Sequence, residues 1–100
     1  MPVFFLAEIE VFDQEKYHAY IEKAFHIVRQ YGGEYIFRSD HIVPVSGNWT
    51  PQRLVLIRFN SKADLHRCFG SEEYLRIKHL REQSTKSRSV IIDQDADGSL

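Results

Sequence analysis

The hydrophobic and polar positions of this chain alternate with two different periods, and the changes of period mark the expected elements. Residues 3–11 (VFFLAEIEV) alternate with a period of two and are rich in β-branched and aromatic residues, which predicts a strand. After Asp13, a plausible N-cap, apolar residues recur at helical spacing as far as Tyr31. Gly32 and Gly33 then predict the end of this helix, because glycine readily adopts the left-handed conformation that helix ends commonly need.

The central part of the chain predicts two strands separated by a polar segment. Residues 34–39 (EYIFRS) alternate, with Tyr35 and Arg38 on opposite sides of the expected strand. Residues 40–52 contain turn residues and two prolines, and Pro44 favours an irregular segment with a short extension at a sheet edge or bulge. Residues 53–59 (RLVLIRF) form the most β-like run in the chain, and both of its faces are largely apolar.

The last third of the chain predicts a helical crossover and a final strand. Ser61 is expected to cap one helical segment and Ser71 a second, and we predict that the two form one helix kinked at Gly70. Residues 88–93 (RSVIID) are then expected to be a strand. Residues 94–100 predict a disordered polar tail, because they contain too little apolar area to fold.

This order of elements consists of two β-α-β halves in tandem. We predict an α+β, ferredoxin-like βαββαβ protomer, in which right-handed crossovers place the helices on one face of a four-stranded antiparallel sheet. The chain has 100 residues, of which 43% are hydrophobic, and this suffices for one small core. Residues 1–93 are therefore expected to form a single domain.

The sheet face opposite the expected helices is also apolar, which predicts that something covers it. A soluble monomer rarely exposes an apolar patch of more than roughly several hundred Å2, and two identical faces can cover each other. We therefore predict a homodimer built sheet against sheet, and the sequence does not indicate any larger oligomer. The residues expected on this face are Phe4, Leu6, Leu54, Leu56 and either Ile91 or its neighbours Val90 and Ile92.

The charge and cysteine content restrict the expected partners and location. The chain carries 13 basic and 14 acidic residues, a formal net charge of −1, so neither nucleic acid nor a membrane is an expected partner. No apolar run approaches the roughly 20 residues of a membrane-spanning helix. The first residues do not have the pattern of a signal peptide, and the single cysteine, Cys68, cannot form an internal disulfide. These features favour the cytoplasm.

Arginines and aromatic residues are the candidate ligand-binding residues. Guanidinium groups bind carboxylates through paired hydrogen bonds, and aromatic side chains provide contact area at a small entropic cost. The same arginines are equally compatible with solvated strand ends or with salt bridges at an interface. In the ligand-binding hypothesis, the anion is held by Arg38 and Arg81, the walls are Tyr35, Trp49 and Tyr74, and Arg53 supports the loop.

Catalytic and metal-binding patterns are sparse. Glu8 and Glu10 share one face of the first strand, where they could act as a general base or pair with Arg38 and Arg58. Ion pairing is the favoured interpretation, because opposite charges often pair across strands. The histidines lack the spacing of metal ligands, so no metal site is expected. Catalytic residues therefore stay unassigned, and no cofactor is expected.

Several segments resemble the DUF1330 family of small bacterial proteins, which belongs to the dimeric α+β barrel superfamily. The resemblance rests on DQEKYHAY, YGGEYIFR, SGNWTPQRLVLIRF, SEEYLRIKHLR and SRSVII, in this order along the chain. It implies a ferredoxin-like protomer whose sheet meets that of a second copy. Superfamily relatives include cofactor-free monooxygenases, haem-degrading enzymes and isomerases with sites between sheet and helices, so the resemblance does not select one function. The family pattern falls on Tyr20, Gly32, Gly33, Tyr35, Arg38, Gly47, Trp49, Arg53, Phe59, Ser71, Tyr74 and Arg81.

The chain departs from the family pattern at positions that bear on chemistry. Ser46 and Arg58 stand where the family usually has glutamate, and Cys68 and Glu72 stand where tryptophan and proline are usual. If the family's pocket uses the two carboxylates as acid or base, this protein has lost that chemistry or changed its ligand.

Two functions therefore agree with the sequence. The first is a pocket for a small anionic or aromatic molecule between the sheet and the helices, in a cofactor-free enzyme or in a binding protein. The alternative is a non-catalytic dimeric module with a structural or interaction role. The sequence does not decide whether the protein is an enzyme.

Overall fold

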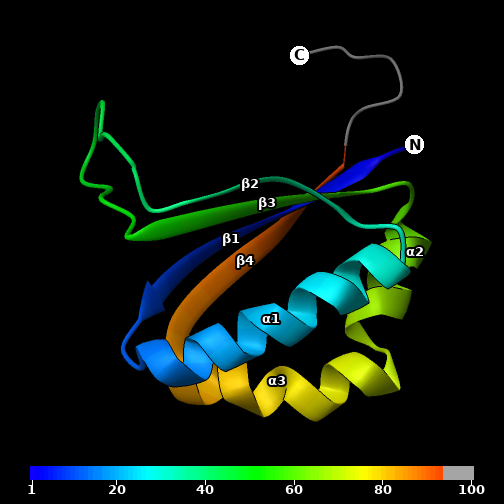
Figure 1. Cartoon of the computed structure of the whole chain (residues 1–100). Helices are drawn as coiled ribbons and strands as arrows, with labels where there is room; N and C mark the ends of the chain where they lie inside the picture. The colour runs from blue at the N-terminus through cyan, green and yellow to red at the C-terminus, as the bar shows by residue number, and fades with distance from the viewer. Residues whose placement is uncertain (94–100) are drawn as a thin grey trace.

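The computed structural model describes residues 1–93, which form one antiparallel sheet with helices on one of its faces (Figure 1). The strands lie in the order β2-β3-β1-β4, and every neighbouring pair is antiparallel. The predicted four-stranded sheet is confirmed, whereas the expected tail, residues 94–100, lies outside the described residues. The elements are β1 (Val3–Val11), α1 (Gln14–Gln30), β2 (Glu34–Ser39), β3 (Arg53–Phe59), α2 (Lys62–Phe69), α3 (Glu72–Ser84) and β4 (Thr85–Asp93).

The helices begin at the capping residues expected from the sequence. The side chains of Asp13, Ser61 and Ser71 each accept a hydrogen bond of 3.1 Å from the backbone N–H three residues later. The single kinked crossover that we predicted is in fact two helices, α2 and α3. Gly70 is the C-cap of α2 and Ser71 is the N-cap of α3, so the end of one helix directly meets the start of the next.

Two strand predictions need correction. Strand β4 begins at Thr85 rather than at residue 88, because it pairs with β1 as far as Val11. The register between β2 and β3 shifts between Tyr35 and Phe37, which inserts a bulge into β2. A bulge moves the following side chains to the other face, so Arg38 shares the helix-covered face with Tyr35 instead of opposing it.

The hydrophobic core lies between the sheet and the helices. It combines the helix-facing residues of β1 and β3 with one side of each helix. Phe59, Cys68 and Tyr74 are almost completely buried within it. The core of the described residues therefore lies on the helix-covered side of the sheet.

The other face of the sheet is apolar, and no helix of residues 1–93 lies over it (Figure 1). The register places Val90 and Ile92 on this outer face, whereas Ile91 pairs with Phe5 on the helix side. The loop between β2 and β3 rises on the same outer side (Figure 1). The apolar residues of the outer face are Phe4, Leu6, Phe37, Leu54, Leu56, Val90 and Ile92.

Candidate functional site

A small cavity between the sheet and the helices combines apolar walls with a few polar groups. Its volume is about 60 Å3, which is small beside the roughly 300–1,000 Å3 of typical ligand pockets. All four strands and all three helices contribute to its lining. The lining residues with polar side-chain atoms are Tyr17, Tyr20, Tyr35, Arg38, Tyr74, Arg81, Ser87 and Ser89.

Tyrosine hydroxyls and arginines form two hydrogen-bonded groups in this region. The hydroxyl oxygens of Tyr20 and Tyr74 lie 2.9 Å apart, and Arg81 Nη1 donates to the Tyr74 hydroxyl at 2.9 Å. Arg53 Nε donates to the hydroxyl of Tyr17 at 3.1 Å. Tyr17 of α1 is thus bonded to Arg53 of β3. Tyr20 of α1 is linked through the Tyr74 hydroxyl to Arg81 of α3.

Burial keeps the phenols of Tyr20 and Tyr35 protonated. It raises the pKa of Tyr20 far above its ordinary value and that of Tyr35 to about 12, because a buried phenolate would lose its hydration. Near neutral pH these side chains therefore act as hydrogen-bond donors or acceptors, and they do not act as bases.

Arg38 lies against two aromatic rings at the edge of the sheet. Its guanidinium carbon is 4.8 Å from the centre of the Tyr35 ring and 5.1 Å from that of Phe25. These two rings stack with their centres 5.6 Å apart. The bulge in β2 makes this arrangement possible, because without it Arg38 would face away from Tyr35.

The structure brings most of the predicted site residues to one region, with one exception. Tyr35, Arg38, Tyr74 and Arg81 line the cavity, and Arg53 contacts it through Tyr17. Trp49 does not join them. The loop carries it to the outer face of the sheet, where it is 47% exposed and donates from Nε1 to Glu8 Oε2 at 2.8 Å.

The predicted pairing of Glu8 with Arg38 or Arg58 is wrong. Glu8 forms an ion pair with Arg88, which lies directly opposite it on β4. The Trp49 hydrogen bond, followed by that of Arg88, lowers the pKa of the Glu8 carboxyl. Arg58 instead donates to Asn60 Oδ1 at 2.9 Å. This arrangement on the outer face holds Glu8 as a carboxylate far from the helix-side cavity.

Sequence reasoning missed several lining residues. Tyr17 and Tyr20 are not among the predicted ligand-binding residues, although their hydroxyls enter the hydrogen-bonded groups of the cavity. Ser87 and Ser89 were missed because the start of the last strand contains little apolar signal. The sequence feature that could have identified Tyr17 and Tyr20 is their residue type, since a buried phenol needs a polar partner.

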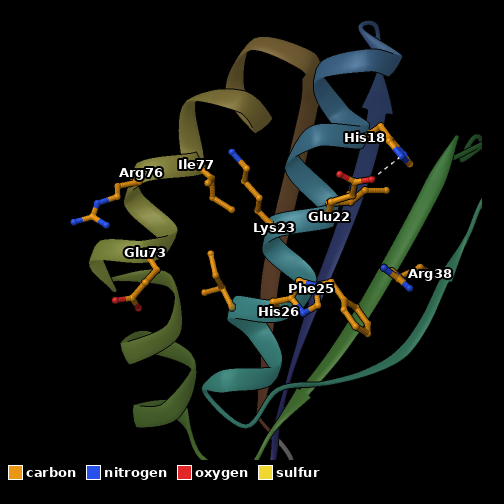
Figure 2. A pocket seen from close by; sticks show the side chains of 11 residues that line it. His18, Glu22, Lys23, Phe25, His26, Arg38, Glu73, Arg76 and Ile77 are labelled. Carbon is orange, nitrogen blue, oxygen red and sulfur yellow. Dashed lines mark ion pairs between the residues drawn. The ribbon is translucent and has the colours of Figure 1, made fainter.

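A larger groove runs over the surface between α1 and α3, but its side chains do not converge. Its volume is about 1,040 Å3, and it is open to solvent. Figure 2 shows Arg76 projecting away from α1, while His18 and Glu22 pair with each other on α1 at 3.1 Å. Charges of both signs line the groove, including Lys23 and Glu73. We therefore take the partly enclosed cavity between the sheet and the helices as the candidate site.

Neither a metal site nor a membrane-spanning helix is present in the described part of the chain. Residues 1–93 contain no group of three or more His, Cys, Asp or Glu side chains placed to hold a metal ion. No helix within the same residues is long and apolar enough to cross a membrane.

The fold and cavity define an α+β protein of the ferredoxin-like type, and comparisons support this class. A protein of unknown function from Rhodopseudomonas palustris has a TM-score of 0.80 and 14% identity, covering 91% of this chain and 80% of that one. A dimeric ferredoxin-like protein of unknown function from Jannaschia sp. CCS1 has a TM-score of 0.69 and 14% identity, covering 93% of this chain and 99% of that one. At these identities the likeness shows the fold alone.

The family itself is shown by sequence. Residues 2–95 match the family described as Domain of unknown function (DUF1330), and the chain belongs to this family. A further solved structure with this fold is SnoaB, a cofactor-independent oxygenase from Streptomyces nogalater. It has a TM-score of 0.69 and 7% identity, and the match covers 94% of this chain and 93% of SnoaB. No curated protein matches the chain significantly.

Proposed function

We propose that this protein binds a small molecule with an anionic group in the cavity between its sheet and helices. The observation that carries this proposal is a set of three arginines, Arg38, Arg53 and Arg81, that each contact a tyrosine of the cavity lining. Within residues 1–93, none of the three forms an ion pair with a carboxylate. A guanidinium that lies near a partly enclosed cavity and has no anionic partner is suited to bind an anion from solution.

The lining favours binding over general-base catalysis. Its ionisable side chains are tyrosines and arginines, and the described lining contains no Asp, Glu, His or Lys. A general base works best with a pKa near the operating pH. Burial instead raises the pKa of Tyr20 and Tyr35 above their ordinary value. SnoaB is described as a cofactor-independent oxygenase, whereas the described lining offers no Asp, Glu, His or Lys as a proton acceptor for a reaction of that kind.

Native mass spectrometry of freshly purified protein tests the proposal. We expect a discrete added mass that Ser89→Leu removes, because Ser89 lines the cavity and a larger side chain there would obstruct it. Lys86→Leu is the matched control, since Lys86 lies on the other face of the same strand and should retain the added mass. A bare protein that also fails to bind any member of a panel of aromatic carboxylic acids would contradict the proposal.

The rival function is a non-catalytic dimeric module, and the small cavity volume favours it. A cavity of about 60 Å3 holds roughly two water molecules at the density of the liquid. If the tyrosines and arginines serve packing alone, the amide signals of the lining residues will not move with any small acid. Nuclear magnetic resonance titration of the labelled protein therefore separates the two functions.

We also propose that two copies associate through the outer sheet face. The face is apolar over β1, β3 and β4, and Val90 and Ile92 are 55% and 44% exposed in the protomer. A hollow of about 300 Å3 between Trp49 and the sheet adds to this surface. The fold is shared with a protein described as dimeric, and a face-to-face dimer would bury the exposed apolar side chains.

A further inference from the structure

The hydroxyl pair inside the cavity leaves one phenolic hydrogen without an acceptor among residues 1–93. A guanidinium only donates hydrogen bonds, so the oxygen of Tyr74 must accept the 2.9 Å bond from Arg81. Tyr74 then either donates its own hydrogen to Tyr20 or accepts the hydrogen of Tyr20 across the 2.9 Å separation. In both arrangements, one of the two phenols keeps a hydrogen that it can donate to a group in the cavity.

Next to this pair, Arg81 has a side chain that only donates hydrogen bonds. Arg81 has five N–H groups, and its side chain makes one hydrogen bond within the described residues. Burial keeps Tyr20 protonated at neutral pH. The serines at β4 can donate or accept, and the described lining contains no carboxylate. A group that carries negative charge and only accepts hydrogen bonds is the chemical complement of this set.

We propose that Arg81 and the Tyr20–Tyr74 pair bind the carboxylate of a small monocarboxylic acid. This inference rests on the proposed ligand cavity and specifies the chemical class of its ligand. A carboxylate presents two acceptor oxygens and no hydrogen, so it takes one bond from the guanidinium and one from the free phenolic hydrogen.

The volume and the lining determine how the acid lies. A cavity of about 60 Å3 accommodates a carboxylate group but not an aromatic ring, since benzene occupies engineered cavities of roughly 150 Å3. The rest of the acid therefore lies at the opening of the cavity. Ser87 and Ser89 are exposed residues of β4 that line the cavity, and their small side chains leave this route open.

Binding of benzoate and of benzamide to the full chain tests the inference. The two probes have nearly the same shape, but benzamide is neutral and carries N–H donors in place of one oxygen. We expect benzoate to bind at least about tenfold more tightly, because hydrogen bonds to a charged group are worth more than neutral ones. Titration of isotope-labelled protein followed by nuclear magnetic resonance gives both affinities and shows whether the lining residues respond.

Variants separate recognition from folding. Arg81→Gln is expected to weaken benzoate about tenfold and to leave benzamide unchanged, and Arg81→Lys should recover part of the loss because it keeps the charge. Tyr74→Phe should weaken benzoate as well. Its fully buried ring makes a folding defect the main risk, so the half-buried Arg81 variants carry the test independently. Arg58→Gln, on the outer face, is the control that leaves both affinities unchanged.

The outcomes distinguish this inference from the proposed function. Equal affinities for benzoate and benzamide, with shifts confined to the cavity lining, would overturn the carboxylate assignment and leave a ligand cavity in place. An absence of shifts at the lining with either probe would overturn both. Benzoate selectivity that disappears in Arg81→Gln and partly returns in Arg81→Lys would support the inference.

Discussion

Glu8 shows how two neighbours set the charge of one residue. Its carboxylate accepts a hydrogen bond from Trp49 and pairs with Arg88, and both interactions favour the ionised form. We predict that Trp49→Phe raises the pKa of Glu8 toward its ordinary value, because the Trp49 hydrogen bond is the largest cause of the lowered pKa. Titration of the Glu8 side-chain carbonyl by nuclear magnetic resonance measures this change.

The pH dependence of stability follows from the direction of that pKa shift. The folded-state pKa of Glu8 lies below its value in the unfolded chain. The interaction therefore stabilises the fold above the unfolded pKa, and this contribution is lost as the pH falls through the folded pKa. Trp49→Phe should reduce the loss of stability between neutral and acidic pH. If the pKa of Glu8 does not move in this variant, Trp49 does not control the carboxylate.

Cys68 provides a second prediction at the scale of one residue. Its side chain is completely buried, and burial raises the pKa of the thiol to about 11. The thiolate is the reactive form, so native protein at pH 8 should react with a thiol reagent much more slowly than protein unfolded in guanidinium chloride. The raised pKa stabilises the fold below the unfolded thiol pKa, and this contribution is lost as the pH rises through about 11. Equal reaction rates in the two states would contradict the prediction.

At the scale of elements, the glycine pair between α1 and β2 offers a matched test. A Cβ atom at Gly33 would lie 2.4 Å from Val28 Cγ1 and 2.9 Å from Phe59 Cε1, whereas at Gly32 nothing lies within 4 Å. Gly32 instead has a φ of +83°, which is unfavourable for other residues. We predict that Gly33→Ala destabilises by roughly 1–3 kcal/mol through overpacking and Gly32→Ala by roughly 1–2 kcal/mol through backbone strain.

Chemical denaturation of the two variants measures these changes. Because the clash at Gly33 involves the buried Phe59 ring, we expect Gly33→Ala to be the less stable variant. The companion substitution Gly32→Asn separates the two mechanisms, since asparagine tolerates a positive φ better than alanine does. A Gly33→Ala variant as stable as the original protein would show that the side chains of Val28 and Phe59 can move away from the added methyl group.

Much of this fold could be predicted from periodicity and capping residues. The first helix between Asp13 and the glycine pair, and the sheet faces of β1 and β3, follow from local patterns. The bulge in β2 could not be predicted, because it depends on how this strand pairs with β3 and not on its own alternation. That single irregularity decides the face on which Arg38 lies.

The candidate site was predictable in its residue types but not in its arrangement. The arginines and tyrosines of the helix side come from four separate elements, and their spacing in the sequence does not show which hydroxyl meets which guanidinium. Trp49 was misplaced because residues 40–52 lack periodicity. Its position is set by contacts distant in sequence, including the 2.7 Å bond from the Val11 backbone N–H to Gln52 Oε1.

At the scale of the whole molecule, the outer face of the sheet leads to the last prediction. Leu56 lies at the centre of the sheet on this face, between Phe37 on β2 and Leu6 on β1. We predict that Leu56→Asp converts a dimer into a monomer, because burying an unpaired carboxylate in an apolar interface is strongly unfavourable. Size-exclusion chromatography with light scattering gives the mass of each species.

A control on the opposite side of the molecule shows whether the effect is local. Leu75 lies on α3 and is 53% exposed, so Leu75→Asp introduces the same charge away from the outer face and should leave the dimer intact. Circular dichroism must show that both variants keep their helices, because a monomer that is also unfolded would not report on the interface. If the unmodified protein is a monomer at micromolar concentration, or if Leu56→Asp remains a dimer, the two copies do not meet through this face.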